Sequence, residues 1–250
     1  MTSDQYVWLL WSLSLLIPWI GFFSFFPRHR KAMLWASLYT TPFGITEPLF
    51  VPKYWNPPSL FHLAQRTGFD IESFIFCFAI GGVGAVAYNI LTHKTPNPVS
   101  NTERQHPLHR HHHKALAAPF ITFALLVWFP WNAIYPGILS MLIGALATAL
   151  CRPDLKWKVF IGGGIFLVFY MIFLLGLDWL APGYIARVWN MNVLTGITLF
   201  KMPIEELLFA IGFGMYWSGV YEHFTWRRVH KMDRLSEDVL SLHEMKGESS

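Results

Sequence analysis

Two stretches of the sequence match: Asp70-Ile71-Glu72-Ser73-Phe74-Ile75-Phe76 and Pro203-Ile204-Glu205-Glu206-Leu207-Leu208-Phe209. Each sets carboxylates at the start of an apolar run that contains glycines. A charged side chain in a membrane helix costs about 2.5–3.5 kcal/mol on insertion scales, and it therefore marks a functional site by default. Because this cost recurs in matching places, the sequence predicts an internal repeat with a carboxylate site.

Further features recur around both stretches in the same order. A lone carboxylate comes first, then a Trp-Asn pair, then the carboxylate stretch, and finally a tyrosine at the same spacing from the first Glu. In the two copies these are Glu47 and Asp178, Trp55-Asn56 and Trp189-Asn190, Glu72 and Glu205, and Tyr88 and Tyr221. The shared order argues against chance similarity between two apolar segments.

The composition indicates an integral membrane protein. Of the 250 residues, 54% are hydrophobic and only 14% are charged, whereas soluble domains carry about 25% charged residues. The net charge of +4 does not indicate nucleic-acid binding, because the basic residues cluster in loops between apolar runs. The first apolar run begins after Asp4 instead of a basic segment, so we interpret it as a helix and not as a cleaved signal peptide.

A membrane-spanning helix needs about 20 apolar residues. On this basis the sequence predicts an all-α membrane protein with seven transmembrane helices, at about 6–26, 32–51, 69–92, 116–131, 135–151, 157–180 and 203–225. Basic residues are more frequent in the first, third and fifth loops and after the last helix. By the positive-inside rule, the N-terminus is outside and the C-terminus is cytoplasmic.

The seven helices divide into a parallel 3+1+3 internal repeat within a single transmembrane domain, 1–250. We expect a first three-helix repeat at 5–93, a basic His-rich loop plus a linking helix at 94–134, a second three-helix repeat at 135–226 and a cytoplasmic tail at 227–250, with a short surface helix in the tail. One linking helix makes both halves cross the membrane in the same sense.

The His-rich loop contains His106-Pro107-Leu108-His109-Arg110-His111-His112-His113. Such a run can bind a metal, or it can be a solvated cytoplasmic loop that contacts anionic lipid headgroups. The sequence leaves both readings open, and we assign no metal ligand from it. The two cysteines, Cys77 and Cys151, lie in or beside apolar runs, and we interpret them as packing residues.

Helical spacing relates the carboxylates to their neighbours. Glu205 and Phe209 are four residues apart and share a helix face, as do Glu72 and Phe76. Glu206 points about 100° away. Glu72 and Glu205 are therefore the equivalent pair in the two halves, and we expect the carboxylates to converge at one level of the membrane.

Buried carboxyls that repel one another can hold an acid and a carboxylate together near neutral pH, which equips a site for general acid–base chemistry. The aromatic residues near the site could stabilise a cation or simply pack. The two asparagines could orient a carboxylate or cap a turn. The candidate catalytic residues are Glu205, Glu206, Glu72, Glu47 and Asp178, and the candidate substrate-binding residues are Trp55, Asn56, Trp189, Asn190, Phe76, Phe209 and Tyr54.

These motifs make the chain resemble the membrane-integral lycopene cyclases, which are two small subunits in some bacteria and fused proteins in other bacteria, archaea and fungi. That family bears a Pro-x-Glu-Glu or Pro-x-Glu-Asp motif in each half. Pro203, Glu205 and Glu206 match it fully, whereas the first half keeps Glu72 but has Asp70 and Ser73 at the other two positions. The segments 26–30 and 52–57 also resemble the family, and the resemblance covers about 5–93 and 150–226.

The resemblance implies a redox-neutral isomerase, an intramolecular lyase that cyclises the linear ends of lycopene to beta-ionone rings in carotenoid biosynthesis. A carboxylic acid would protonate the terminal double bond, and a carboxylate would later remove a proton, so no cofactor is expected. Glu205 would be the general acid or its partner. Glu206, Glu72 and Glu47 would share the base and charge-balancing roles, and Asp178 is a further candidate.

The resemblance also implies a lipophilic carotenoid substrate taken from the bilayer, contact with membrane lipids, no nucleic acid, and a multi-pass location in a bacterial or archaeal plasma membrane. Contact with other carotenoid enzymes or a homo-oligomer stays open, as does the ring isomer. Three alternatives remain: a related carotenoid or prenyl cyclase, a proton-coupled membrane transporter, and a carotenoid-binding or rhodopsin-like module. Transport is disfavoured because the inner halves of the predicted helices look apolar.

Overall fold

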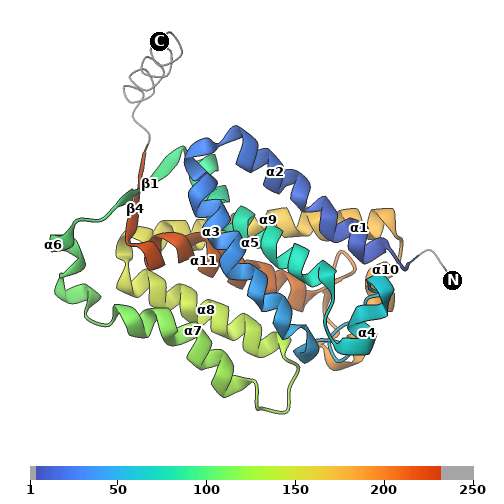
Figure 1. Ribbon diagram of the computed structural model, residues 1–250. Helices are drawn as coiled ribbons and strands as arrows, with labels where there is room; N and C mark the ends of the chain where they lie inside the picture. The colour runs from blue at the N-terminus through green and yellow to red at the C-terminus, as the bar shows by residue number, and fades with distance from the viewer. Residues whose placement is uncertain (1–3, 232–250) are drawn as a thin grey trace, which may run out of the picture.

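The computed structural model describes residues 4–231, which form a bundle of helices lying roughly side by side (Figure 1). The predicted surface helix of the tail falls largely outside these residues. The first predicted helix is divided into α1 (Val7–Ser14) and α2 (Leu16–Phe25). Pro18 explains the division, because it has no N–H to donate to the carbonyl of Ser14. The side chain of Ser12 also bonds back to the carbonyl of Trp8 (2.8 Å).

The second predicted helix is regular only in its first half. After the 3₁₀ turn η1 (Pro27–His29), α3 (Arg30–Thr40) gives way to the 3₁₀ segment η2 (Thr41–Leu49). Pro42 and Pro48 lie in this segment and cannot donate to a helical ladder. The prediction of one continuous helix over 32–51 is therefore wrong. Glu47 lies on the 3₁₀ segment η2 and not on an α-helix.

The central helices are α5 (Ile71–Leu91) and α11 (Ile204–Thr225), which carry the two matching stretches. Asp70 is the N-cap of α5, and its carboxylate accepts the backbone N–H of Ser73 at 2.5 Å. Pro203 occupies the corresponding position before α11. Asp70 thus begins its helix by capping, whereas Pro203 does so by its fixed backbone angle.

The two Trp-Asn pairs lie against each other at one end of the bundle. Trp55 and Trp189 form an antiparallel bridge. The N–H of Asn56 donates to the carbonyl of Val188, and the N–H of Asn190 donates to that of Tyr54, both at 2.9 Å. Short elements surround them: η3 (Leu60–His62), α4 (Leu63–Thr67), α10 (Tyr184–Val188), η6 (Met191–Val193), β2 (Thr198–Leu199) and β3 (Met202–Pro203).

The segments that follow α5 and α11 pair at the other end. There β1 (Lys94–Pro98) runs antiparallel to β4 (Arg227–Lys231), with Lys94 opposite Lys231. The sequence predicted neither strand pair. The remaining elements are α6 (Asn101–Arg104), η4 (Pro107–His109), α7 (His112–Leu126), α8 (Ile134–Cys151), η5 (Pro153–Leu155) and α9 (Lys156–Leu180). The linking helix α7 therefore begins earlier than the predicted residue 116.

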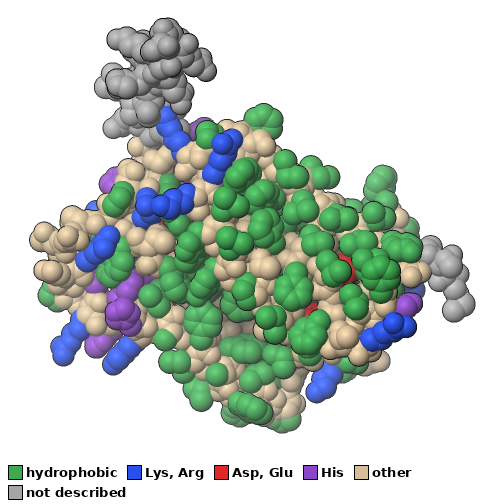
Figure 2. Space-filling view, in the orientation of Figure 1, with side chains coloured by type: hydrophobic (Ala, Val, Ile, Leu, Met, Phe, Trp, Pro, Cys, Tyr) green, Lys and Arg blue, Asp and Glu red, His purple; other side chains and the backbone are tan. Residues whose placement is uncertain are grey.

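Among the described residues, four helical stretches are long and apolar enough to cross a membrane: Val7–Phe25, Ile71–Leu91, Ile134–Cys151 and Pro153–Leu180. Figure 2 shows hydrophobic side chains over the middle of the visible face, with Lys, Arg and His gathered toward the end that carries α6. The protein is thus mostly helical, and these apolar helices indicate membrane association.

Close helix packing at the centre depends on glycines. A Cβ on Gly81 of α5 would lie 1.9 Å from Oγ1 of Thr40 in α3. A Cβ on Gly214 of α11 would lie 2.5 Å from Cβ of Phe166 and 2.7 Å from the carbonyl oxygen of Gly162, both in α9. These two glycines therefore let α5 and α11 approach their neighbours more closely than any larger residue would.

The sequence suggested that the inner halves of the helices are apolar. In the structure, the halves of α5, α9 and α11 nearer to β1 and β4 contain buried polar side chains. Nζ of Lys158 in α9 lies 2.6 Å from Oε1 of Glu222 in α11, and Asn89 of α5 donates to the same oxygen at 3.0 Å. All three side chains are buried. This network joins three helices inside the bundle, and neither partner of the ion pair was predicted.

Candidate active site

Glu206, in the first turn of α11, is buried and accepts hydrogen bonds from three aromatic side chains. Nε1 of Trp189 donates to Oε1 and the hydroxyl of Tyr170 donates to Oε2, both at 2.7 Å. The hydroxyl of Tyr54 also donates to Oε1. These donors come from α9 and from the two loops that carry the Trp-Asn pairs, so tertiary structure assembles the site.

Hydrogen bonds of this kind stabilise the ionised form of a carboxyl group, whereas burial favours the neutral form. A neutral acid in this place could not donate its proton to a tryptophan N–H, which is only a donor. Trp189 therefore fixes Oε1 as an acceptor, and with both tyrosine hydroxyls donating as well, Glu206 is suited to act as a proton acceptor. No lysine or arginine approaches it among the ion pairs of the described residues.

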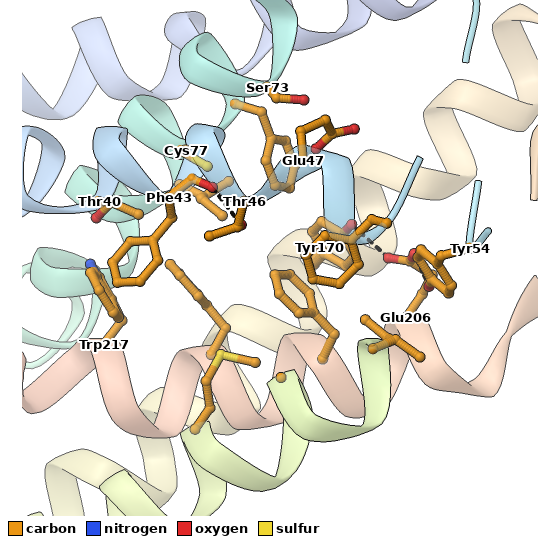
Figure 3. A pocket seen from close by; sticks show the side chains of 18 of the residues that line it. Thr40, Phe43, Thr46, Glu47, Tyr54, Ser73, Cys77, Tyr170, Glu206 and Trp217 are labelled. Carbon is orange, nitrogen blue, oxygen red and sulfur yellow. Dashed lines mark hydrogen bonds between the residues drawn. The ribbon is translucent and has the colours of Figure 1, made fainter. Parts of the chain in front are cut away.

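A cavity of about 310 Å³ lies beside Glu206, and its wall is mostly aromatic (Figure 3). The predicted substrate-binding residues that line it are Tyr54, Trp55, Phe76, Trp189 and Phe209. Figure 3 places Tyr54 and Glu206 toward one side of the cavity, and Thr40, Phe43 and Trp217 toward the other. The Glu206 carboxyl and the Tyr54 hydroxyl therefore lie at one side of a cavity whose opposite side has mainly aromatic side chains and the hydroxyl of Thr40.

Glu47 is the second carboxyl of this cavity and comes from η2 (Figure 3). Its side chain is buried, and its Oε1 has no hydrogen-bond partner within residues 4–231. A buried carboxylate oxygen without a partner is costly, so burial of this group favours the neutral acid. The cavity thus contains two carboxyls in different environments, which is the arrangement that separates an acid from a base.

Glu205 and Glu72 are buried but are not part of the described cavity lining. Oε1 of Glu205 accepts the N–H of Thr195 (2.8 Å) and the hydroxyl of Tyr135 (2.9 Å), and Oε1 of Glu72 accepts the N–H of Leu60 (2.7 Å). Each glutamate therefore fastens the loop that follows a Trp-Asn pair. Their equivalent contacts agree with the predicted pairing, but Glu206, and not Glu205, shares the cavity with Phe209.

Asp178 is not brought to the cavity. It lies near the end of α9, where Nζ of Lys201 is 3.1 Å from its Oδ2 and the N–H of Gly183 donates to its Oδ1 at 3.1 Å. The asparagines serve the loops: Asn56 accepts from Gln65 (3.3 Å), and Asn190 donates to the carbonyl of Lys53 (3.2 Å). Their side chains therefore support turns, which was one of the two readings that the sequence allowed.

Tyr170 is a site residue that the sequence analysis missed. It lies in the aromatic run of α9, eight residues before Asp178, just as Tyr39 lies eight residues before Glu47. This shared spacing was one available signal, and the other was a hydroxyl within an otherwise apolar helix, which usually finds a partner when it is buried.

Phe43 of η2 and Phe120 of α7 mark a place where the cavity wall reaches the surface. Both line the cavity, and their rings stack with centroids 6.5 Å apart. Phe43 is 36% exposed and Phe120 is 41% exposed. At this point, the aromatic side chains that line the cavity are therefore also part of the protein surface.

A comparison with protein families finds that residues 132–224 match the family model described as lycopene cyclase. No curated protein and no solved structure matches the chain. The matched range extends from before α8 to near the end of α11 and includes Tyr170, Trp189 and Glu206. The resemblance seen in the sequence is confirmed over residues 150–224, whereas its first part, residues 5–93, lies outside the matched range.

Proposed function

We propose that this protein closes the linear ends of lycopene to beta-ionone rings, as a fused, single-chain cyclase. The match of residues 132–224 to the lycopene cyclase family model supports this proposal. The observation that carries this proposal is the pair Glu206 and Glu47 in one aromatic cavity. The reaction is an isomerisation by acid and base, and the substrate is a lipophilic carotenoid that enters from the bilayer.

Glu47 is the general acid in this proposal. Its proton goes to the terminal double bond of the carotenoid, which leaves a tertiary carbocation. The neighbouring double bond attacks this cation and closes a six-membered ring, so the positive charge moves to a ring carbon. Glu206 then removes a proton from the ring and a new double bond forms. One proton is added and one is lost, so the product is an isomer of the substrate.

The aromatic wall supports both stages. The faces of Trp55, Phe76 and Phe209 attract a cation without being able to take its proton. Their apolar surface also keeps water from trapping the carbocation. Glu205 and Glu72 act as positioning residues, because each holds the loop next to a Trp-Asn pair.

For the whole chain we propose seven transmembrane helices in a parallel 3+1+3 repeat, with α3–η2, α7 and α11 completing the four long apolar stretches. Three contacts between the halves support it. Trp55 meets Trp189, β1 meets β4, and Asn89 meets Glu222, each residue of the last pair directly following the recurring tyrosine. The basic end of Figure 2 supports a cytoplasmic C-terminus.

Expression in a lycopene-accumulating bacterium tests the function. Pigments would be separated by chromatography and characterised by absorption and mass. We expect an isomer of unchanged mass with a blue-shifted, less structured spectrum, and its retention identifies the ring. Unchanged lycopene, with the folded protein present in the membrane, would contradict the proposal.

A further inference from the structure

A second cluster of polar side chains lies away from the cavity residues, where α7 begins and where α8 and α11 end. His112 is the first residue of α7, Cys151 is the last of α8, and His223 lies in the last turn of α11. All three side chains are buried. We propose that they bind a zinc ion, which would fasten the three helix ends together.

The distances suit a metal. One ligand atom from each of the three residues lies within 4.8 Å of the others. Nδ1 of His112 is 3.5 Å from Sγ of Cys151. In a tetrahedral zinc site, bond lengths of about 2.0–2.1 Å to nitrogen and 2.3 Å to sulfur place these two atoms about 3.6 Å apart. A small movement of the His223 side chain would bring its ring nitrogen within bonding distance of the same ion.

Hydrogen bonds within the protein do not satisfy this cluster. Nε2 of His112 and Nε2 of His223 are buried and find no partner among the residues that the structure describes. An S–H···N hydrogen bond would account for Sγ of Cys151 and Nδ1 of His112 but would leave Nε2 of His223 without a partner. Since buried polar atoms are normally paired, this unpaired nitrogen of His223 indicates a missing ligand. Nε2 of His112 stays unpaired when Nδ1 of the same ring coordinates the ion.

The surroundings are those of a closed metal site. The hydroxyl of Thr148 lies 3.0 Å from Nδ1 of His223, so it can accept the Nδ1 proton and leave Nε2 free to coordinate. The indole of Trp226 stacks on His112 with ring centroids 4.0 Å apart and covers that ring. Nδ1 of His109 lies 4.0 Å from Sγ of Cys151 and is the candidate fourth ligand.

The nearby positive charge is compensated. Arg152 follows Cys151 and is buried, but Asp154 accepts two hydrogen bonds from its guanidinium, at 2.8 and 2.7 Å. A cysteine thiolate would add a further negative charge. One thiolate with imidazoles is a ligand set that favours zinc over hard cations such as magnesium or calcium.

The test is the metal content of the purified full-length protein, carrying an affinity tag without histidine and passed through a mild chelator. We expect about one zinc per chain in the unaltered protein. Cys151→Ser and His223→Gln should lose it. His113→Gln is the matched control, because His113 is exposed in the same His-rich run, and it should keep the zinc. Equal zinc in Cys151→Ser and the unaltered protein would overturn the proposal, as would its loss in His113→Gln alone.

Cobalt provides a measurement that does not depend on how the variants fold. Adding Co²⁺ to the metal-free, otherwise unaltered protein should give a thiolate-to-cobalt absorption band in the near ultraviolet and visible bands of tetrahedral Co²⁺. A folded protein that shows neither band would refute the site. Both readouts are independent of carotenoid cyclisation, so this proposal and the proposed function stand or fail separately.

Discussion

Glu206 is the residue on which the proposed chemistry depends most. We expect Glu206→Gln to lower cyclisation by about 10²-fold or more, since general acid–base catalysis contributes about 10²–10⁴-fold. The amide is close in shape and can still accept some of the three hydrogen bonds, so the protein should fold. The measurement is the ratio of cyclised to linear pigment per folded protein.

Glu205→Gln is the contrasting variant. Its amide oxygen can still accept the N–H of Thr195, so cyclisation should fall by much less than in Glu206→Gln. The opposite order would restore Glu205 as the acid or base, which is the role the sequence alone suggested. The sequence predicted that carboxyls would be buried here, but not which one faces the substrate, because the rotation of α11 is set by packing against α8 and α9.

A different kind of effect is expected at Glu222. Glu222→Gln leaves Lys158 buried beside a neutral side chain, and breaking a buried ion pair by removing one partner costs about 3–5 kcal/mol. Thermal unfolding in detergent should therefore occur at a clearly lower temperature. Glu103→Gln is the control, because its ion pair with Arg228 is partly exposed and contributes about 0–1 kcal/mol. Equal unfolding temperatures would show that the Lys158–Glu222 network does not stabilise the bundle.

Among the elements, the contact between α9 and α11 is sensitive to added volume. Gly214→Ala would press a methyl group into Phe166 and Gly162, and overpacking of this kind costs about 1–3 kcal/mol. Gly164→Ala is the matched control on α9, because a Cβ there meets nothing within 4 Å. It should leave the unfolding temperature unchanged or slightly raised. An unchanged unfolding temperature in Gly214→Ala would mean that α9 and α11 can move apart without a loss of stability.

Long apolar elements were the easiest to predict from sequence, because length and composition alone define them. α5, α8, α9 and α11 begin and end within two or three residues of expectation. The 3₁₀ segment η2 was missed because a local effect of Pro42 and Pro48 overrides the apolar pattern. The β1–β4 pair was missed for the opposite reason: each strand is short, and its partner lies far away in the sequence.

The molecule as a whole is predicted to have its N-terminus outside. A single cysteine in place of Arg66, which is exposed in α4, should react with a membrane-impermeant thiol reagent applied to intact cells. One in place of Arg110, exposed in the His-rich loop, should react only after the membrane is opened. Labelling in the reverse order would show that the topology is the opposite of the predicted one. Labelling of both cysteines from one side would show that α5 does not cross the membrane between them.

The thin aromatic partition formed by Phe43 and Phe120 has a consequence for the order of products. A carotenoid that enters the cavity laterally from the bilayer, between η2 and α7, can place one end at the site while its other end stays among the lipid tails. Each binding event then closes one ring only. The carotenoid must dissociate and reorient before its other end can bind. A pigment time course should therefore show a singly closed carotenoid rising first and the doubly closed one following after a lag. Appearance of the doubly closed pigment without that lag would mean that the substrate is never released between its two ends.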